Sequence, residues 1–230
     1  MTGEKVLILH VLPDLGVGGA ELMMKRLVES HLGDPRYEHR VVSLRSVGPV
    51  GAMLQARGVG VEALGIEGAA GTVPTLLRLV RIIRSARPDI VQTWMYHSDL
   101  LGGLAARLSG CRRIVWGVRA ADINVGVARS TRLIRRLCAR LSPIVPTRIV
   151  YVAEAARRVH EQLGYDRDKG VVIPNGFLVP ESPPDTSYFR RTLGLPPGTF
   201  LVGAAGRFNA LKDYATFVRA AGQGIGAHSN

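Results

Sequence analysis

Short apolar runs alternate with helical patterns along most of the chain. Seven runs rich in valine, isoleucine and leucine have the length of buried strands, and they span residues 5–11, 39–44, 60–66, 89–94, 112–118, 148–153 and 170–174. Between them, apolar residues recur three or four positions apart, which predicts helices near residues 20–32, 50–57, 72–88, 100–108, 130–142 and 154–163. Such alternation is typical of parallel strands joined by right-handed helical crossovers, so we predict the α/β class with an open parallel sheet.

The pattern changes near residue 178. Residues 178–199 contain five prolines, which predict a linker with one short helix. The segment "FLVGAAGRFNALKDYATFVRAA" then predicts a strand, a loop and a helix, the first unit of a second α/β domain. The final "GQGIGAHSN" predicts neither a strand nor a continuation of that helix, so we expect the second domain to be incomplete. We therefore divide the chain into a first domain (1–178), a linker (179–199) and a truncated start of a second domain (200–230).

The first predicted helix is preceded by a turn with many glycines. Gly16, Gly18 and Gly19 crowd this turn, and Glu21 follows at once. Glycine at a strand-to-helix turn lets the backbone approach a ligand and leaves the first N–H groups of the helix free for an anion. The turn differs from the dinucleotide-binding fingerprint because Glu21 stands where the third glycine belongs. Ligands of open α/β sheets bind beyond the carboxyl ends of strands, so the candidate binding loops are 12–19, 94–98, 118–126 and 174–178.

The composition adds a strong positive charge. Lysine and arginine number 30 against 18 acids, a net charge of +12, which favours acidic partners such as nucleic acid, anionic lipid or phosphorylated ligands. Aromatic residues make up only 6% and no RNA-binding or zinc-finger motif appears, which argues against nucleic acid. No apolar run reaches the ~18 residues of a membrane span, and the first residues lack the features of a signal peptide. We therefore expect a cytoplasmic protein, and we expect its two cysteines to be reduced thiols.

Four short motifs carry a resemblance to a known family. They are "GGAE" (residues 18–21), "WMYHSDLLG" (94–102), "VIPNGF" (172–177) and "GRFNALKD" (206–213). In this order, on an α/β chain with a linker before the fourth, they resemble the retaining GT-B glycosyltransferases of family 4. The resemblance covers residues 5–221. It implies two Rossmann-like domains that face each other across a cleft, the first holding the acceptor and the second the nucleotide-sugar donor.

The resemblance implies a donor-side role for four residues. Gly18 and Gly19 match the turn whose backbone N–H groups lie near the donor phosphates; a turn needed only for packing is the alternative. Arg207 and Lys212 match a catalytic pair of cations that stabilises the departing nucleoside diphosphate. Negative charge builds up on this group as the glycosidic bond breaks, so fixed cations stabilise it more than the ground state. The alternative for this pair is a solvated cationic loop.

Other residues are candidates on the acceptor side. His97 matches a histidine that can orient an acceptor hydroxyl, and a histidine that caps the following helix or packs against Trp94 is the alternative. Arg119 stands where many relatives carry a histidine. Arg119 and Asp122 can therefore serve as polar acceptor-site residues or form an ion pair with no catalytic part. Asn175 resembles part of the family turn that closes the first domain, and we read it as structural.

Arginines also gather on one predicted helix. Residues 123–153 contain six arginines and no acid. On a helical wheel we place Leu133, Ile134, Leu137, Cys138 and Leu141 on one side, and the arginines on the other: Arg129, Arg132, Arg135, Arg136 and Arg140. A basic amphipathic helix suits docking on anionic lipid, so these arginines are candidates for peripheral contact with the inner membrane face. An ordinary core helix with a solvated arginine face is the alternative.

These observations predict a glycosyltransferase that moves a sugar from a nucleotide-diphosphate donor to a saccharide or lipid-linked acceptor with retention, as in polysaccharide biosynthesis. No acidic D-x-D cluster appears, so we expect no required metal or other cofactor. The glutamate-rich motif of the family's second domain lies beyond residue 230. The alternative is therefore a truncated, non-catalytic remnant that binds acceptor or membrane, and the enzymatic activity of this chain stays open between the two.

Overall fold

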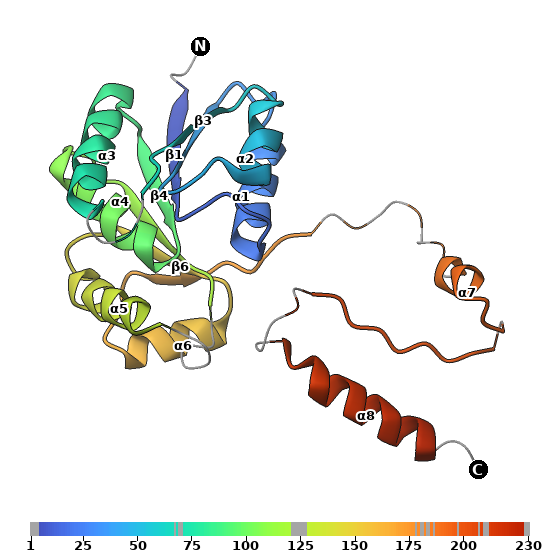
Figure 1. Cartoon of the computed structure of the whole chain (residues 1–230). Coiled ribbons are helices and arrows are strands. Elements are labelled where there is room, and N and C mark those ends of the chain that lie inside the picture. The colour runs from blue at the N-terminus through green and yellow to red at the C-terminus, as the bar shows by residue number, and fades with distance from the viewer. Residues whose placement is uncertain are drawn as a thin grey trace. The chain divides into compact units, whose positions relative to one another are not determined.

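The computed structural model describes residues 5–66, 68, 71–120, 128–177, 179, 182, 185, 187–196, 198–206, 208 and 212–227. These residues fall into two compact units, and the boundary between them in the sequence lies after Gly176. Unit 1 contains the sheet and the helices that cover it, and unit 2 contains the helices α7 and α8 (Figure 1). We describe each unit by itself.

Unit 1 is built on one sheet in which all seven strands run parallel, in the order β3-β2-β1-β4-β5-β6-β7. The strands are β1 (Val6–Leu12), β2 (Tyr37–Ser43), β3 (Gly60–Ala63), β4 (Ile90–Trp94), β5 (Ile114–Val118), β6 (Arg148–Tyr151) and β7 (Gly170–Val172). The predicted parallel α/β sheet is confirmed. The strand order reverses between β1 and β4, and this is the place where such sheets bind ligands.

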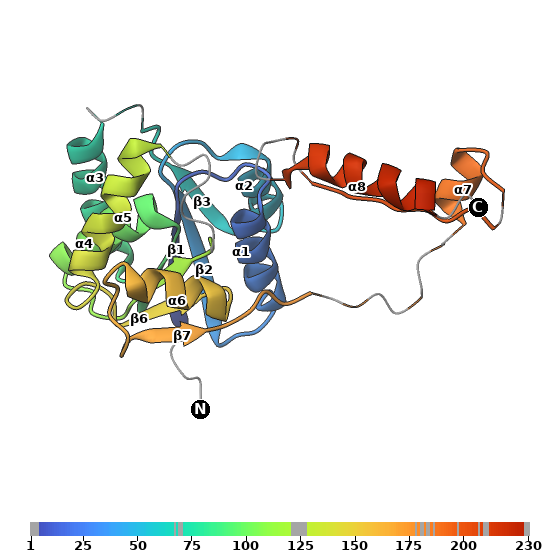
Figure 2. The same cartoon turned by 90° about the horizontal axis from the view of Figure 1, so that it is seen from below.

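Helices cover both faces of this sheet (Figure 2). One layer contains α1 (Gly19–Ser30) and α2 (Gly48–Gln55); the other contains α3 (Thr72–Ala86), α4 (Tyr96–Leu108), α5 (Arg129–Leu141) and α6 (Glu154–Gln162). Right-handed crossovers explain this division, because connections that run in opposite directions along a sheet lie on opposite faces. The buried apolar residues accordingly form two clusters, one with Met24 and Trp94 under α1 and α2, and one with Leu79 and Cys138 under the other helices.

Helix α4 begins earlier than the sequence predicts. It starts at Tyr96, directly after Met95, whose φ of 71° and ψ of 155° place a non-glycine residue in a region that favours glycine. This strained turn lets the helix begin as soon as β4 ends, and Asp99 is therefore fully buried in its first turn. Further along, a Cβ on Gly102 would lie 2.9 Å from Cγ2 of Thr93. Glycine is needed there for the close contact between α4 and the sheet.

Unit 2 differs from the predicted secondary structure in two places. It contains α7 (Tyr188–Thr192), which is the short helix predicted in the linker, and α8 (Tyr214–Ala227). The described residues 198–206 form no strand, although "FLVGAA" has the composition of one. A strand needs a neighbouring strand, and none of the other described residues of unit 2 supplies one. The helix continues through residues 222–227, where we predicted that it stops; glycine weakens a helix interior but only proline blocks it outright.

Candidate functional site

The predicted site residues of unit 1 lie at the carboxyl edge of the sheet. Gly18 and Gly19 begin α1 after β1, and His97 lies in the first turn of α4 after β4. Arg119 follows β5 directly, and Asn175 follows β7. Because all these strands are parallel, the loops that follow them share one edge.

The glycine turn presents a helix N-terminus without a side-chain cap. Gly18 is the N-cap residue, in an extended conformation with φ of −152° and ψ of 170°, and no side chain accepts a hydrogen bond at this end of α1. The first N–H groups of a helix have no partner within the helix, so they are available to an anion here. A Cβ on Gly18 would collide with the carboxylate of Glu21, whereas Gly16 and Gly19 have open space around them. Of these glycines, Gly18 is the one that a side chain cannot replace without moving a neighbour.

Arg119 is held from two sides at the same edge. Its guanidinium carbon lies 4.5 Å from the centre of the Trp94 ring, a cation–π contact, and its Nη1 donates to Oδ1 of Asn175 at 3.0 Å. Burial lowers the pKa of Arg119 from its usual value. Its buried Nε has no hydrogen-bond partner among the described residues. This guanidinium is therefore fixed in direction by Trp94 and Asn175.

Asp122, the predicted companion of Arg119, lies outside the described residues. Neither the acceptor-site hypothesis nor the ion-pair hypothesis for it is tested. Sequence reasoning treated Trp94 only as a neighbour of His97 and read Asn175 as structural, so it missed that both hold Arg119. The available signal was the position of each residue at the end of a predicted strand.

His97 is half-buried in the first turn of α4, and burial lowers its pKa. No hydrogen bond or ring contact joins it to another described residue, and the N-cap position of α4 belongs to Met95. The structure therefore does not support helix capping by this histidine. Its packing against Trp94 stays an open alternative. Its role toward an acceptor hydroxyl stays a prediction.

Asp99 and Thr93 form a buried polar pair below the start of α4. Oγ1 of Thr93 donates to Oδ1 of Asp99 at 2.5 Å, and Oδ2 of Asp99 has no partner among the described residues. Burial raises the pKa of Asp99 well above its usual value, and hydrogen bonds from Thr93 and from the backbone of Gly117 oppose that rise. Burial thus favours the neutral acid at this position.

The arginines of α5 do not all face solvent. Arg129, Arg132, Arg136 and Arg140 are exposed, but Arg135 is only 6% exposed, so its predicted place on the outward face is wrong. Leu133, predicted on the inward face, is 58% exposed. At about 100° per residue, position 135 lies on the same side of the helix as the buried Cys138, and position 133 lies almost opposite to it. The predicted wheel therefore assigned both Arg135 and Leu133 to the wrong side.

The predicted cationic pair belongs to unit 2, where only one member is described. Lys212 is exposed, and Cε of its side chain lies 3.4 Å from the position that a Cβ on Gly206 would occupy. The stem of Lys212 therefore lies over the start of the "GRFNALKD" loop. Arg207 lies outside the described residues, so the pairing of the two cations is not tested.

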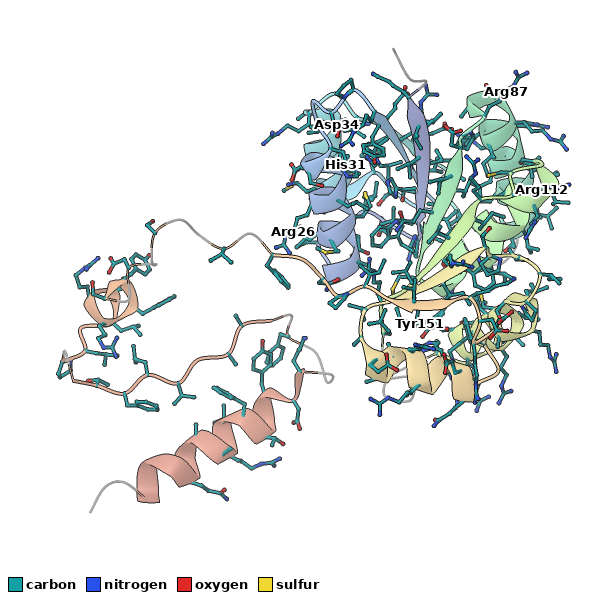
Figure 3. The ribbon with its side chains drawn as sticks, turned by 180° about the vertical axis from the view of Figure 1, so that it is seen from behind. Arg26, His31, Asp34, Arg87, Arg112 and Tyr151 are labelled. Carbon is teal, nitrogen blue, oxygen red and sulfur yellow. The ribbon has the colours of Figure 1, made fainter. Side chains whose placement is uncertain are left out.

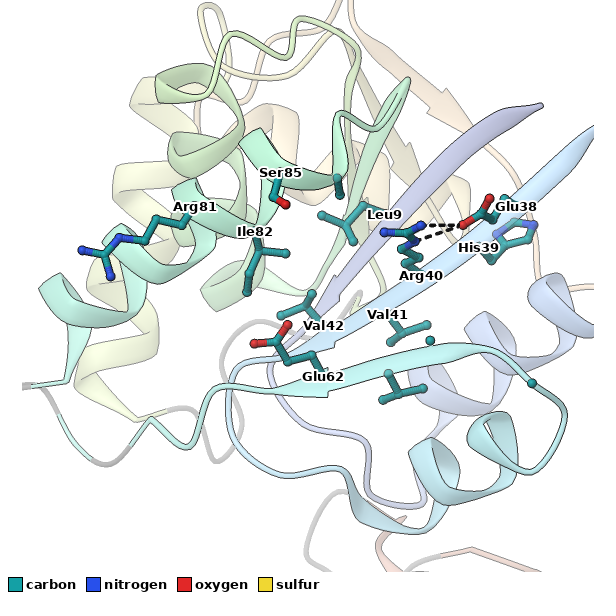
Figure 4. A pocket seen from close by; sticks show the side chains of 14 residues that line it. Leu9, Glu38, His39, Arg40, Val41, Val42, Glu62, Arg81, Ile82 and Ser85 are labelled. Carbon is teal, nitrogen blue, oxygen red and sulfur yellow. Dashed lines mark hydrogen bonds and ion pairs between the residues drawn. The ribbon is translucent and has the colours of Figure 1, made fainter. Parts of the chain in front are cut away.

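A groove lies on a different part of unit 1. It has a volume of about 860 Å³ and lies between the C-terminal half of α3 and strands β2 and β3, with Leu9, Arg40, Val42, Glu62 and Arg81 among its lining residues (Figure 4). Arg40 and Glu38, which both line the groove, form an ion pair with 2.9 Å between Nη2 of Arg40 and Oε1 of Glu38. None of the predicted site residues lines this groove. It is an open part of the sheet face beside α3, away from the carboxyl edge.

Two further properties of the described residues concern a metal-binding cluster and a membrane-spanning helix. Among them, no group of three or more histidine, cysteine, aspartate or glutamate side chains is arranged to hold a metal ion. Within the same residues, no helix combines the length and the apolar character that crossing a membrane requires. Both cysteines, Cys111 and Cys138, are free thiols, as predicted.

Comparison with known proteins gives a family match and a set of similar folds. The family model described as Glycosyltransferase Family 4 matches residues 17–177. A D-inositol 3-phosphate glycosyltransferase from Nocardia farcinica is 40% identical over 76 residues, which make up 33% of this chain and 17% of that protein.

Two solved structures show the extent of the structural likeness. HepE from Anabaena, determined in complex with UDP-glucose, superposes with a TM-score of 0.75 at 20% identity, over 94% of this chain and 57% of that one. A glycosyltransferase from Rickettsia africae gives a TM-score of 0.70 at 16% identity, over 96% of this chain and 58% of that one. The chain thus spans little more than half the length of these structures, and the likeness shows a shared fold.

Proposed function

Because the chain belongs to glycosyltransferase family 4, we propose that its protein transfers a sugar from a nucleotide-diphosphate donor to a saccharide or lipid-linked acceptor, with retention of anomeric configuration. The observation that carries the proposal is the fixed guanidinium of Arg119 at the carboxyl edge of the sheet. It lies in the region that matches the family, together with Gly18, Gly19 and His97. A fixed cation, a half-buried histidine and an open helix N-terminus suit a polar, negatively charged substrate.

The donor class is supported by two observations. The HepE structures were determined with UDP-glucose, with UDP, and with UDP and glucose, so a related fold holds a nucleotide sugar. In this chain, the N-terminus of α1 offers N–H groups beside Gly18 and Gly19. We infer that these N–H groups bind the donor diphosphate and that Arg207 and Lys212 stabilise it as it leaves. Cations fixed at a departing diphosphate lower the barrier because charge grows there in the transition state.

The acceptor side is assigned to Arg119 and His97. The guanidinium of Arg119 suits a phosphate or carboxylate of the acceptor. Burial lowers the pKa of His97, so its imidazole favours the neutral form, which can accept a proton from an acceptor hydroxyl. The structure gives no separate observation on Asp122.

The donor assignment is tested by binding and by turnover. In a panel of nucleoside diphosphates and nucleotide sugars, Gly18→Ala should weaken diphosphate binding about tenfold. The added methyl group stands at the N-cap of α1, beside N–H groups whose hydrogen bonds to charged oxygen contribute roughly 1.5–3 kcal/mol. Gly16→Ala is the matched control, because it has open space and should bind as the parent does. Lys212→Ala should reduce turnover about 10²–10³-fold. Equal diphosphate binding by both glycine variants, or near-normal turnover without Lys212, would remove the assignment. The anomeric configuration of the product decides whether the transfer proceeds with retention.

A second candidate function rests on the exposed face of α5. Leu133 shares the exposed side of α5 with four arginines, Arg129, Arg132, Arg136 and Arg140, and no acid lies on this helix. This combination of an apolar side chain with a basic rim suits an anionic lipid surface. Membrane contact is compatible with transfer of a sugar to a lipid-linked acceptor. It is also the function expected of a truncated, non-catalytic remnant that only binds the membrane.

A further inference from the structure

A column of three imidazoles crosses the layer between the sheet and α1. Nε1 of Trp94 donates to Nδ1 of His10 at 3.2 Å, Nε2 of His10 lies 2.9 Å from Nδ1 of His39, and Nε2 of His39 lies 2.9 Å from Nδ1 of His31. The rings are stacked, with centroids 5.2 Å apart for His10 and His39 and 5.1 Å apart for His39 and His31. The column runs from Trp94 at the carboxyl end of β4 to His31 at the C-terminal end of α1.

Trp94 fixes the direction of every hydrogen bond in this column. An indole N–H can only donate, so Nδ1 of His10 must accept and Nε2 of His10 must carry the proton. Because Nε2 of His10 donates, Nδ1 of His39 must accept, and its Nε2 then donates to Nδ1 of His31. A second proton on His10 would lie on Nδ1, where its N–H would face the indole N–H and neither group could accept a hydrogen bond. The column therefore has one consistent arrangement, in which all three rings are neutral.

Burial keeps the inner part of the column neutral. His10 is fully buried and its pKa is lowered to about 3, mainly by burial and then by the other two histidines. His39 is buried and its pKa is lowered to about 4, mainly by burial and then by His31. His31 forms the outer end, stacked on Tyr37 at 4.5 Å.

Charged groups lie near both ends of the column: Arg119 stacks on Trp94 at the inner end, and other charges lie at the outer end. Figure 3 shows His31 and Asp34 close together at this end of unit 1. The guanidinium of Arg36 lies over the Tyr37 ring at 5.4 Å and also pairs with Asp34 at 2.7 Å. Lys5 and Glu38 line the surface pocket that His31 and His39 share. The structure gives none of these outer charges a contact with His10, whose polar partners among the described residues are Trp94 and His39.

We propose that His10, His39 and His31 are positioning residues for Arg119, and that they act through Trp94. The guanidinium of Arg119 lies over a fully buried indole whose N–H is anchored on His10. The plane of that ring decides where a cation can stack on it, and the bond to His10 fixes the plane together with the packing around the ring. The effect of this positioning on sugar transfer rests on the acceptor-side role proposed for Arg119. The test of the positioning itself does not depend on that role.

The test uses the indole N–H and the Nε–H of Arg119 as NMR reporters in the complete chain. The sequence has two tryptophans, so Trp116→Phe assigns the signals. His10→Asn keeps an amide oxygen near the position of Nδ1, which can still accept from Trp94. His10→Gln instead keeps an amide nitrogen near the position of Nε2, which can donate to His39 but leaves Trp94 without an acceptor.

We expect His10→Gln to move the Trp94 indole N–H upfield and to reduce the ring-current shift of the Arg119 side chain. His10→Asn keeps the bond to Trp94 but loses the bond to His39, so both signals should shift less in that variant. A His10→Gln protein that loses the indole hydrogen bond with unchanged Arg119 signals would overturn the proposal. So would a His10→Asn protein that shifts as far as His10→Gln, because the effect would then be general loss of packing. These readouts need no turnover, so a failed transfer assay and a failed positioning test are distinguished.

A second pair keeps the proposal testable if His10→Gln does not fold. His39→Asn keeps an acceptor for His10, and His39→Leu removes it. We expect the Arg119 signals to shift in His39→Leu and to stay near the parent values in His39→Asn. Arg119 signals that are the same in both variants would contradict the proposed action through the column.

Discussion

At the scale of the residue, burial decides which charged forms this fold accepts. His10 is fully buried, so an imidazolium there would lose its hydration without gaining an acid as partner. Asp99 is equally buried, and the same effect favours its neutral acid. Arg119 stays charged because a guanidinium is rarely deprotonated, and the Trp94 ring replaces part of its lost water.

The lowered pKa of His10 predicts a loss of stability in acid. Between about pH 3 and pH 6.5 the unfolded chain binds a proton at His10 that the folded chain does not, so stability rises with pH in this window. The contribution is complete above pH 6.5 and is lost as the pH falls. At pH 5 we expect about 2 kcal/mol to be lost relative to pH 7 from this residue.

His10→Asn isolates this effect, because asparagine does not titrate and keeps the bond to Trp94. Its unfolding free energy, measured by urea denaturation, should fall less between pH 7 and pH 5 than that of the parent. Asp99 acts with the opposite sign, since its raised pKa makes stability fall as the pH rises, but it is present in both proteins. Parallel pH profiles of the two proteins would show that His10 contributes nothing.

Single-residue chemistry was the part least accessible from the sequence. A histidine inside the apolar run of β1 signals a satisfied buried polar group, but its partners His39 and Trp94 come from other strands. The contact between Arg119 and Trp94 depends on the pairing of β4 with β5, which no local pattern specifies. The strained Met95 has no signal in composition either, because the strain is imposed by the surrounding packing.

At the scale of the element, α5 shows how a small angular error changes an interpretation. The strongly amphipathic pattern of residues 129–141 predicts the helix correctly, with ends within one residue of those observed. Placing its members around the axis needs the buried centre, Cys138, as reference. With that reference, four arginines and Leu133 remain outside, and Arg135 moves to the inside.

The corrected face gives a quantitative prediction for membrane binding. Four arginines near an anionic surface contribute roughly 1 kcal/mol each, so we expect sedimentation with vesicles containing phosphatidylserine at low salt and its loss at high salt. Arg132→Gln with Arg136→Gln should weaken partitioning about 30-fold. Arg57→Gln with Arg112→Gln is the matched control, because it removes two exposed arginines from other elements. Equal weakening by both pairs would show a response to net charge rather than to α5.

At the scale of the whole molecule, the two units differ in how much they bury. All the fully buried apolar residues of the described chain belong to unit 1, and both core clusters end before residue 177. In unit 2, Phe200 and Phe208 are 88% and 95% exposed. Unit 1 therefore has the core of an independent domain.

This difference predicts that unit 1 folds without unit 2. A chain that ends at Phe177 should melt within about 2 °C of the same transition in the complete chain, because surface changes rarely exceed ±0.5 kcal/mol. The measurement is thermal unfolding followed by circular dichroism. A markedly lower midpoint would mean that unit 2 stabilises unit 1 through contacts outside the described residues.

The alternation of patterns was enough to predict the sheet of unit 1, because buried parallel strands and amphipathic helices each leave a strong signal in sequence. The prediction of a strand at "FLVGAA" was wrong because a local pattern does not show whether a partner strand is present. Its composition favours a strand, but a strand exists only beside another. The predicted domain limits (1–178, 179–199 and 200–230) stay a hypothesis.

The placement of Trp94 has a practical consequence. One of the two tryptophans of the sequence lies directly beneath the proposed acceptor cation, and the other, Trp116, is buried on β5. With Trp116→Phe, the remaining indole becomes a single intrinsic fluorophore whose emission depends on the guanidinium above it and the imidazole beside it. Candidate acceptors can then be screened by fluorescence in the unlabelled protein, before any transferred sugar is identified.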